Sequence, residues 1–156
     1  MLIANELVPR VGMDDKNIHA SVISGKLRVM TFTFKATEAD ADLETKKLLI
    51  GYLPAGRGRV QPLLSRIKVT DYPDAGMTYT IGLEAYTSSD PATGAVAASA
   101  TSISSSITAS SSVASFIGAT QGIPYQSLDD IPIVMHCSAE IPADMVVEGI
   151  IVYNIT

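Results

Sequence analysis

Residues 77–87 alternate between apolar and polar side chains, which is the pattern of a half-buried β-strand. Met77, Tyr79, Ile81 and Leu83 share one parity, and threonines occupy much of the other. A helix would spread these apolar residues around its axis, whereas a strand places them all on one face. The segment therefore predicts a strand that needs a second layer of structure to cover its apolar face.

Five other segments carry strand signals, with β-branched and aromatic residues bounded by Pro and Gly. They are residues 26–36, 45–53, 59–71, 131–137 and 145–155. Phe32 and Phe34 are expected to face the core. Pro62 indicates a bulge or a sheet edge within its segment. The turn residues at 73–76 predict a hairpin that joins 59–71 to 77–87.

Residues 95–118 differ from the rest because they contain no charged side chain and are rich in Ser and Ala. Val96, Ala100, Ile103 and Ile107 recur at helical spacing. Serine is a poor helix former, however, so an ordered Ser-rich loop is the alternative. Both interpretations stay open, and residues 119–130 are expected to be polar and turn-like.

These short strands with Pro- and Gly-containing turns predict a mainly β chain, folded as an antiparallel β-sandwich. Its 156 residues suit one domain and are enough to bury a core without disulfides. We expect an N-terminal arm at 1–24, where Pro9 and Gly12 interrupt the apolar residues, followed by a single sandwich domain at 25–156.

Charged residues make up only 17% of the chain and apolar residues 47%. Soluble domains average about 25% charged residues, so part of this surface is expected to lie against other protein chains. The arm residues Leu2, Ile3, Leu7 and Val8 are the expected assembly contacts. The net charge of -5 argues against nucleic acid. We expect no membrane span and no signal peptide, because no long apolar run and no basic leader occur.

No constellation of catalytic or metal-binding residues emerges from the sequence, so we expect no enzyme, no cofactor and no metal. His136 and Cys137 are adjacent, but adjacent strand residues point to opposite faces of a sheet. Residues 51–58 have the glycine spacing of a phosphate loop without its Lys-Ser/Thr pair. Asp71, Asp74 and Asp90 do not follow the order of a calcium loop. Whether an ion binds these Asp-bearing loops stays open.

Residues 49–60 read Leu-Ile-Gly-Tyr-Leu-Pro-Ala-Gly-Arg-Gly-Arg-Val and are similar to a run, Ile-Gly-x-Leu-Pro-Ala-Gly-Ala-Arg-Val, in small virion proteins of tailed bacteriophages. In those proteins a strand with the pattern Thr-x-x-Ile-Gly-Leu follows, and residues 79–83, Tyr-Thr-Ile-Gly-Leu, stand in that place. An Asp-containing loop, an Ala/Ser-rich stretch and a closing strand near a Tyr come next. Asp90, residues 95–118 and Tyr153 match that order, so the resemblance covers residues 26–156.

The resemblance implies a virion structural protein of the capsid decoration or cement type. Such a protein is a jelly-roll-like β-sandwich, made in the host cytoplasm and carried on the phage head. Its implied partners are copies of itself, as a homotrimer, and the major capsid protein, with no nucleic acid, membrane or small-molecule substrate. The long Ser-rich segment and the arm leave the position in the virion open.

Three alternatives to a cement protein remain. A head–tail connector or a tail protein would differ in its copy number per particle. A β-sandwich module that binds a carbohydrate or a receptor usually presents exposed aromatic rings, and this chain has no Trp and six Tyr. A hydrolase lacks every constellation of residues that its chemistry requires.

Overall fold

The computed structural model describes residues 2–3, 27–37, 46–73, 76–118 and 122–155. Its strands are β1 (Leu2–Ile3), β2 (Leu27–Lys35), β3 (Lys47–Leu53), β4 (Gly56–Val60), β5 (Arg66–Thr70), β6 (Thr78–Leu83), β7 (Tyr86–Thr87), β8 (Ala95–Val96), β9 (Ser99–Thr108), β10 (Ala114–Ser115), β11 (Ile123–Ser127), β12 (Ile131–Cys137) and β13 (Val146–Ile155). One 3-10 helix, η1 (Pro62–Leu64), separates β4 from β5. The predicted mainly β chain is confirmed.

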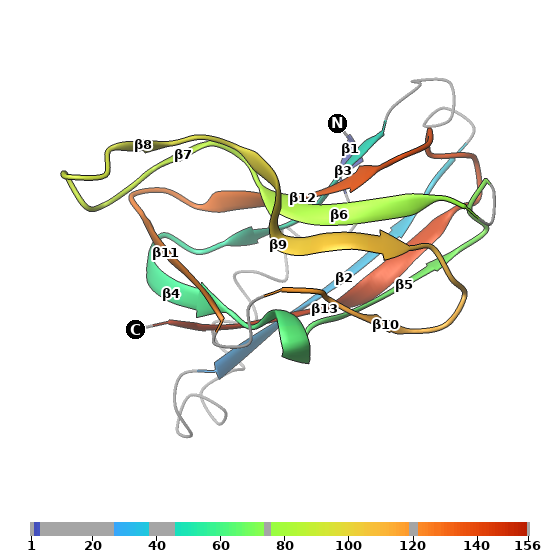
Figure 1. Cartoon of the computed structure of the whole chain (residues 1–156), viewed down its shortest axis with the longest axis horizontal. Coiled ribbons are helices and arrows are strands. Elements are labelled where there is room, and N and C mark those ends of the chain that lie inside the picture. Colours follow the sequence, from blue (N-terminus) through green and yellow to red (C-terminus); the bar gives the residue numbers. More distant parts are fainter. Residues whose placement is uncertain (1, 4–26, 38–45, 74–75, 119–121, 156) are drawn as a thin grey trace.

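Two sheets lie face to face, as Figure 1 shows. Sheet A has the strand order β1-β3-β12-β6-β9. In sheet B, β13 is central: β2 pairs with one of its sides, and β4 and β5 pair with the other. β10 and β11 then pair with β5 and β4. All of these pairings are antiparallel except that between β1 and β3.

The strand order is that of a jelly roll. When β4 and β5 are counted as one strand, and β10 and β11 as another, the main strands in chain order are β2, β3, β4/β5, β6, β9, β10/β11, β12 and β13. Across sheet B the order of these strands is first, last, third and sixth. Across sheet A it is second, seventh, fourth and fifth. Two interleaved Greek keys produce this order. The jelly-roll-like sandwich that the sequence resemblance implied is therefore confirmed.

The predicted hairpin between residues 59–71 and 77–87 is wrong. β5 pairs with β10 and β13 in sheet B, whereas β6 pairs with β9 and β12 in sheet A. The connection between β5 and β6 crosses from sheet B to sheet A, because the third and fourth strands of a jelly roll lie in different sheets. Turn residues at 73–76 suit either connection, and Asp74 lies outside the described residues.

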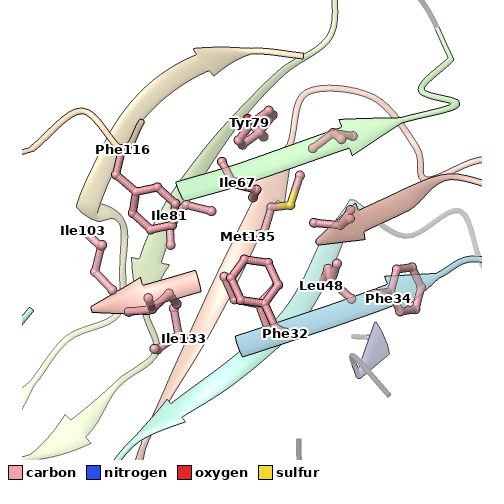
Figure 2. Packing of buried hydrophobic residues seen from close by; sticks show 14 of the residues in the cluster. Phe32, Phe34, Leu48, Ile67, Tyr79, Ile81, Ile103, Phe116, Ile133 and Met135 are labelled. Atoms are coloured by element: carbon pink, nitrogen blue, oxygen red, sulfur yellow. The ribbon is translucent and has the colours of Figure 1, made fainter. Parts of the chain in front are cut away.

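The core fills the space between the sheets. Figure 2 shows Phe32 and Ile67 of sheet B close to Ile81 and Met135 of sheet A. These four side chains are at most 3% exposed. The predicted inward faces of 26–36 and 77–87 are thus confirmed, and β13 is buried at three consecutive residues near its end, as expected for a strand covered on both faces.

Residues 95–118 form strands, so the prediction of a helix or a loop is wrong. β9 pairs with β6 through shifted registers, Tyr79↔Ile107, Ile81↔Ser104 and Leu83↔Ser99, which leave extra residues on β9. Such bulges reset the alternation of faces. Regular alternation is therefore lost along β9, where the adjacent Ile103 and Ser104 are both buried. The spacing of four residues between Ile103 and Ile107 fits a strand as well as a helix, because both place residues i and i+4 on one face.

Residues 119–130 were expected to be turn-like, but β11 (Ile123–Ser127) pairs with β4 over its whole length. Tyr125 and Ser127 are buried, while Pro124 is exposed. β11 lies at the rim of sheet B, where a proline that lacks an N–H is tolerated. Pro and polar residues on an edge strand look like a turn when they are read along the chain alone.

Candidate assembly surfaces

His136 and Cys137 lie on opposite faces of β12, as predicted. Cys137 faces the core and is 7% exposed, and burial raises the pKa of its thiol to about 12. His136 is partly exposed. Burial, followed by the nearby Lys47, lowers its pKa below the ordinary 6.5, with Glu84 acting in the opposite direction. A buried, protonated thiol that faces away from the imidazole is an inert arrangement.

Asp90 shapes the tip of the hairpin between β7 and β8. Its carboxylate accepts hydrogen bonds from the Ala92 N–H at 3.0 Å and from the Thr93 hydroxyl at 3.2 Å. Asp71 lies elsewhere, after β5, at a φ of 56°. Within the described residues, no three His, Cys, Asp or Glu side chains are grouped so that they could hold a metal ion. Asp90 therefore has a local structural role. Those same residues contain no helix with the length and apolar character of a membrane span.

The outer face of sheet B exposes large apolar side chains from β2 and from η1, which lie on opposite sides of β13. β2 directs Met30, Phe32 and Phe34 into the core, so the residues that alternate with them face outward. η1 projects from sheet B on the side away from sheet A (Figure 1). The exposed side chains are Leu27, Val29, Leu63 and Leu64, to which Val113 adds a fifth, with exposures between 38% and 64%. We call these five residues the sheet B patch.

A shallow hollow of about 340 Å³ lies in the centre of the same face. Thr31 of β2, Arg66 of β5 and Ile150 of β13 line it, and Val113 stands at its rim. Beside it, Lys68 and Glu148 form an exposed ion pair at 3.6 Å. Threonine and charged side chains thus line this hollow together with Ile150, and of the five patch residues only Val113 lines it.

A groove borders β11 at the other rim of the sandwich. Three adjoining hollows of about 180, 190 and 210 Å³ share Pro124. Tyr86 of the projecting β7–β8 hairpin lines two of them, and Arg57 lines the third. The hairpin is held against β11 by a hydrogen bond from the Leu128 N–H to the Thr87 carbonyl at 3.0 Å. The groove thus lies between an edge strand and an anchored hairpin.

Two polar atoms in this groove lack partners. The Tyr125 hydroxyl and the Gln126 Oε1 are buried, and neither makes a hydrogen bond with the part of the chain that the structure describes. Burial raises the pKa of Tyr125, an effect that Tyr153 reinforces and Arg28 opposes, so the hydroxyl stays protonated. Buried polar groups of this kind are normally satisfied by water or by a ligand.

The predicted contact residues fall partly within the structure. Leu2 and Ile3 form β1, which pairs in parallel with Leu48 and Leu49 of β3. Leu7 and Val8, like most of the predicted arm at 1–24, lie outside the described residues. The contact role of all four stays a prediction.

The sequence analysis did not single out the sheet B patch or the β11 groove. A signal for the patch was present, because Leu27 and Val29 are apolar on the parity opposite to Phe32. A strand that is apolar on both parities has one apolar face left over once the core is filled.

Comparison with known proteins gives one structural likeness. No family model matches the chain, and no curated protein matches it. A solved structure described as "Cyanophage Pam1 capsid asymmetric unit" contains a chain with 17% sequence identity and a TM-score of 0.41. The alignment covers 85% of this chain and 86% of that chain.

Proposed function

We propose that this chain is a virion structural protein, a capsid cement or decoration subunit that stabilises a phage head by binding neighbouring subunits. The observation that carries the proposal is the sheet B patch, which places five exposed apolar side chains on one part of the surface. The sequence resemblance to small virion proteins of tailed phages indicates which kind of assembly would cover it. The partners proposed are two further copies, in a homotrimer, and the major capsid protein.

The physical case rests on apolar burial with little charge to desolvate. Full burial of one exposed Leu or Val contributes about 1.5–3 kcal/mol, so a few such side chains can hold a modest interface. A subunit that binds at several points is held more tightly, because the first contact raises the effective concentration for the others. With only 17% charged residues, the surface loses little hydration when it is covered.

A matched pair of variants tests the role of the patch. Leu64 in η1 and Leu128 after β11 are 51% and 61% exposed, and only Leu64 belongs to the patch. Leu64→Lys should weaken binding to purified heads at least about tenfold, which is about 1.4 kcal/mol. Leu128→Lys should bind like the unmodified protein, and both should unfold at the same temperature. Equal binding by the two variants would show that the patch is not the interface.

Mass spectrometry of purified particles tests the class of function. The protein should be present in many copies per head, and light scattering of the free protein should give the mass of three chains. A copy number that fits a single ring would favour a head–tail connector or a tail protein instead. Absence from the particle would exclude every virion role.

We also propose that the chain performs no catalysis, since its thiol is buried and protonated and its one described histidine faces away from it. Turnover of any small molecule by the purified protein would contradict this.

The second candidate function is recognition of a carbohydrate or a receptor. It is favoured by the β11 groove, where the Tyr125 hydroxyl and the Gln126 Oε1 lack partners beside the Tyr86 ring. Saccharide hydroxyls could satisfy both atoms while a ring stacks on Tyr86. Binding to a glycan array that is lost in Gln126→Leu would support this candidate, and a blank array would remove it.

A further inference from the structure

We propose that β1 of one copy of this chain completes sheet A of a neighbouring copy, by adding to that copy's β3 in the register Leu2↔Leu48 and Ile3↔Leu49. The inference rests on the proposed assembly of copies, and it names the strand and the sheet edge that join them. The structure contains the same pairing within one chain. Contacts of this kind are identical whether the strand comes from the same copy or from the next one.

The acceptor edge is apolar on both of its faces. Leu48 points into the sandwich core and Leu49 points away from it, yet they are 0% and 1% exposed. Val134, the partner of Leu49 on β12, also lies outside the core cluster and is fully buried. Antiparallel sheets commonly have one face that is exposed to solvent. The edge of β3 that accepts β1 is therefore apolar on both faces, which suits an apolar strand added beside it.

The donor strand is short and is attached by a long connection. β1 contributes two residues, and residues 4–26 separate it from β2, a stretch of 23 residues. When extended, such a stretch reaches roughly 75–85 Å, at about 3.3–3.6 Å per residue. That length exceeds what a strand needs to reach the sheet of an adjoining copy. The connection therefore does not restrict β1 to the β3 of its own chain.

The assembled state lets exchange compete with self-pairing. A pairing of two residues in an isolated chain must offset the entropy of fixing both the strand and the ends of its connection. Once copies are held side by side by other contacts, a neighbour's β3 is presented at a fixed position, and the effective concentration is comparable. Each exchanged strand then ties two copies together, so strand addition and subunit association reinforce each other.

Two populations of chains that each carry one engineered cysteine test the exchange. Both have Cys137→Ala, which removes the native thiol. One carries Ile3→Cys and the other carries Leu49→Cys with a longer tag, and the two are co-expressed as full chains. Residues paired on adjacent strands lie within the Cα separation that a disulfide requires. Mild oxidation should give a covalent product that contains one chain of each kind.

Controls separate exchange from random collision. Ile3→Cys mixed with Leu128→Cys, an exposed position after β11, should give no more than a few per cent of that product. A single chain with both Ile3→Cys and Leu49→Cys should form oligomers linked between copies. If this double variant forms only internal bridges and the mixed populations never couple, the proposal is overturned.

A deletion gives a second readout if Leu49→Cys reduces folding. A chain that lacks residues 1–3 should keep its unfolding temperature as a dilute monomer but should lose at least tenfold in association, measured by light scattering. Undiminished association would overturn the exchange while leaving the virion role in place. If the full-length chain neither associates nor occurs in particles, both the exchange and the proposed function fail.

Discussion

Serine hydroxyls replace backbone partners at the places where strands of this sandwich are interrupted. Where η1 separates β4 from β5, the Ser65 hydroxyl accepts a hydrogen bond from the Val152 N–H at 3.0 Å and donates to the Gln61 carbonyl at 2.9 Å. Along β9, the Ser102 hydroxyl accepts from the Leu83 N–H at 2.9 Å. Serines that read as flexible or surface residues thus serve the hydrogen-bond network of the interior.

Ser65→Ala should lower the free energy of unfolding by about 1–3 kcal/mol, because the buried Val152 N–H would lose its partner. Urea unfolding measures the change. Ser106→Ala on the exposed side of β9 is the control and should stay within about 0.5 kcal/mol of the unmodified protein. Equal effects of the two substitutions would show that the hydroxyl of Ser65 is dispensable.

Gly82 on β6 allows β9 to bulge across it. A Cβ at this position would collide with the Ser99 carbonyl oxygen and would lie 2.7 Å from the Ala100 Cα, both of which are backbone atoms. Gly82→Ala should therefore cost more than about 3 kcal/mol or prevent folding.

Gly94→Ala is the matched comparison for Gly82→Ala. Gly94 has a φ of +63° but open space around it, so the alanine there should cost only the left-handed penalty of about 1–2 kcal/mol. Thermal unfolding ranks the two variants. A Gly82→Ala protein as stable as Gly94→Ala would mean that β9 can shift away.

The thiol of Cys137 gives a prediction for pH dependence. Its folded pKa of about 12 exceeds the value near 8.5 of a free thiol, so the folded protein keeps a proton that the unfolded chain releases. This contribution to stability is complete below pH 8.5 and is lost as the pH rises toward 12, by about 1.4 kcal/mol per unit at most. Cys137→Val should flatten the decline in unfolding free energy above pH 9. An unchanged slope would assign the decline to other groups, such as Tyr79, whose pKa is also raised to about 12.

At the scale of elements, alternation within regular strands was readable from the sequence. Residues 131–137 were predicted as a strand and form β12 with the same bounds. The inward faces of β2 and β6 also followed from parity alone. Failures arose where pairing is irregular: the bulges of β9 interrupt the alternation of buried and exposed residues that marks a strand, and the long-range partners of β5 could not be inferred from local turn residues.

The candidate surfaces were less predictable than the strands. Leu27 and Val29 lie on one face of the sandwich with η1 and Val113 only because β13 pairs with β2 on one side and with β4 and β5 on the other. The β11 groove depends on where the β7–β8 hairpin rests. Neither relation between distant parts of the chain has a local sequence signal.

The β7–β8 hairpin should be rigid at its tip because of Asp90. Asp90→Ala removes the acceptors of the Ala92 N–H and the Thr93 hydroxyl, so amide exchange over residues 92–94 should accelerate at least tenfold. The global free energy of unfolding should change by less than about 0.5 kcal/mol, since the tip is exposed. Exchange that stays slow would show that the backbone turn alone holds the tip.

At the scale of the whole molecule, a surface with few charges predicts how association responds to salt. Contacts between apolar patches are not screened, whereas exposed ion pairs weaken as the Debye length shrinks from about 10 Å at 0.1 M salt to about 3 Å at 1 M. The mass measured by light scattering should therefore be the same at both salt concentrations. Dissociation at high salt would indicate an interface held by charges such as Arg57 and Arg59.

The central position of β13 in sheet B has a consequence for biosynthesis. β13 follows every other described strand in the chain, yet β2, β4 and β5 all hydrogen-bond to it. While the ribosome is still translating residues 146–155, β2, β4 and β5 lack the strand that joins them, and sheet B cannot be completed, although β4 and β5 can already pair with β11 and β10. Sheet B should thus form only after residues 146–155 have left the ribosome, and until then the chain, with its apolar strands uncovered, is the form that chaperones would encounter.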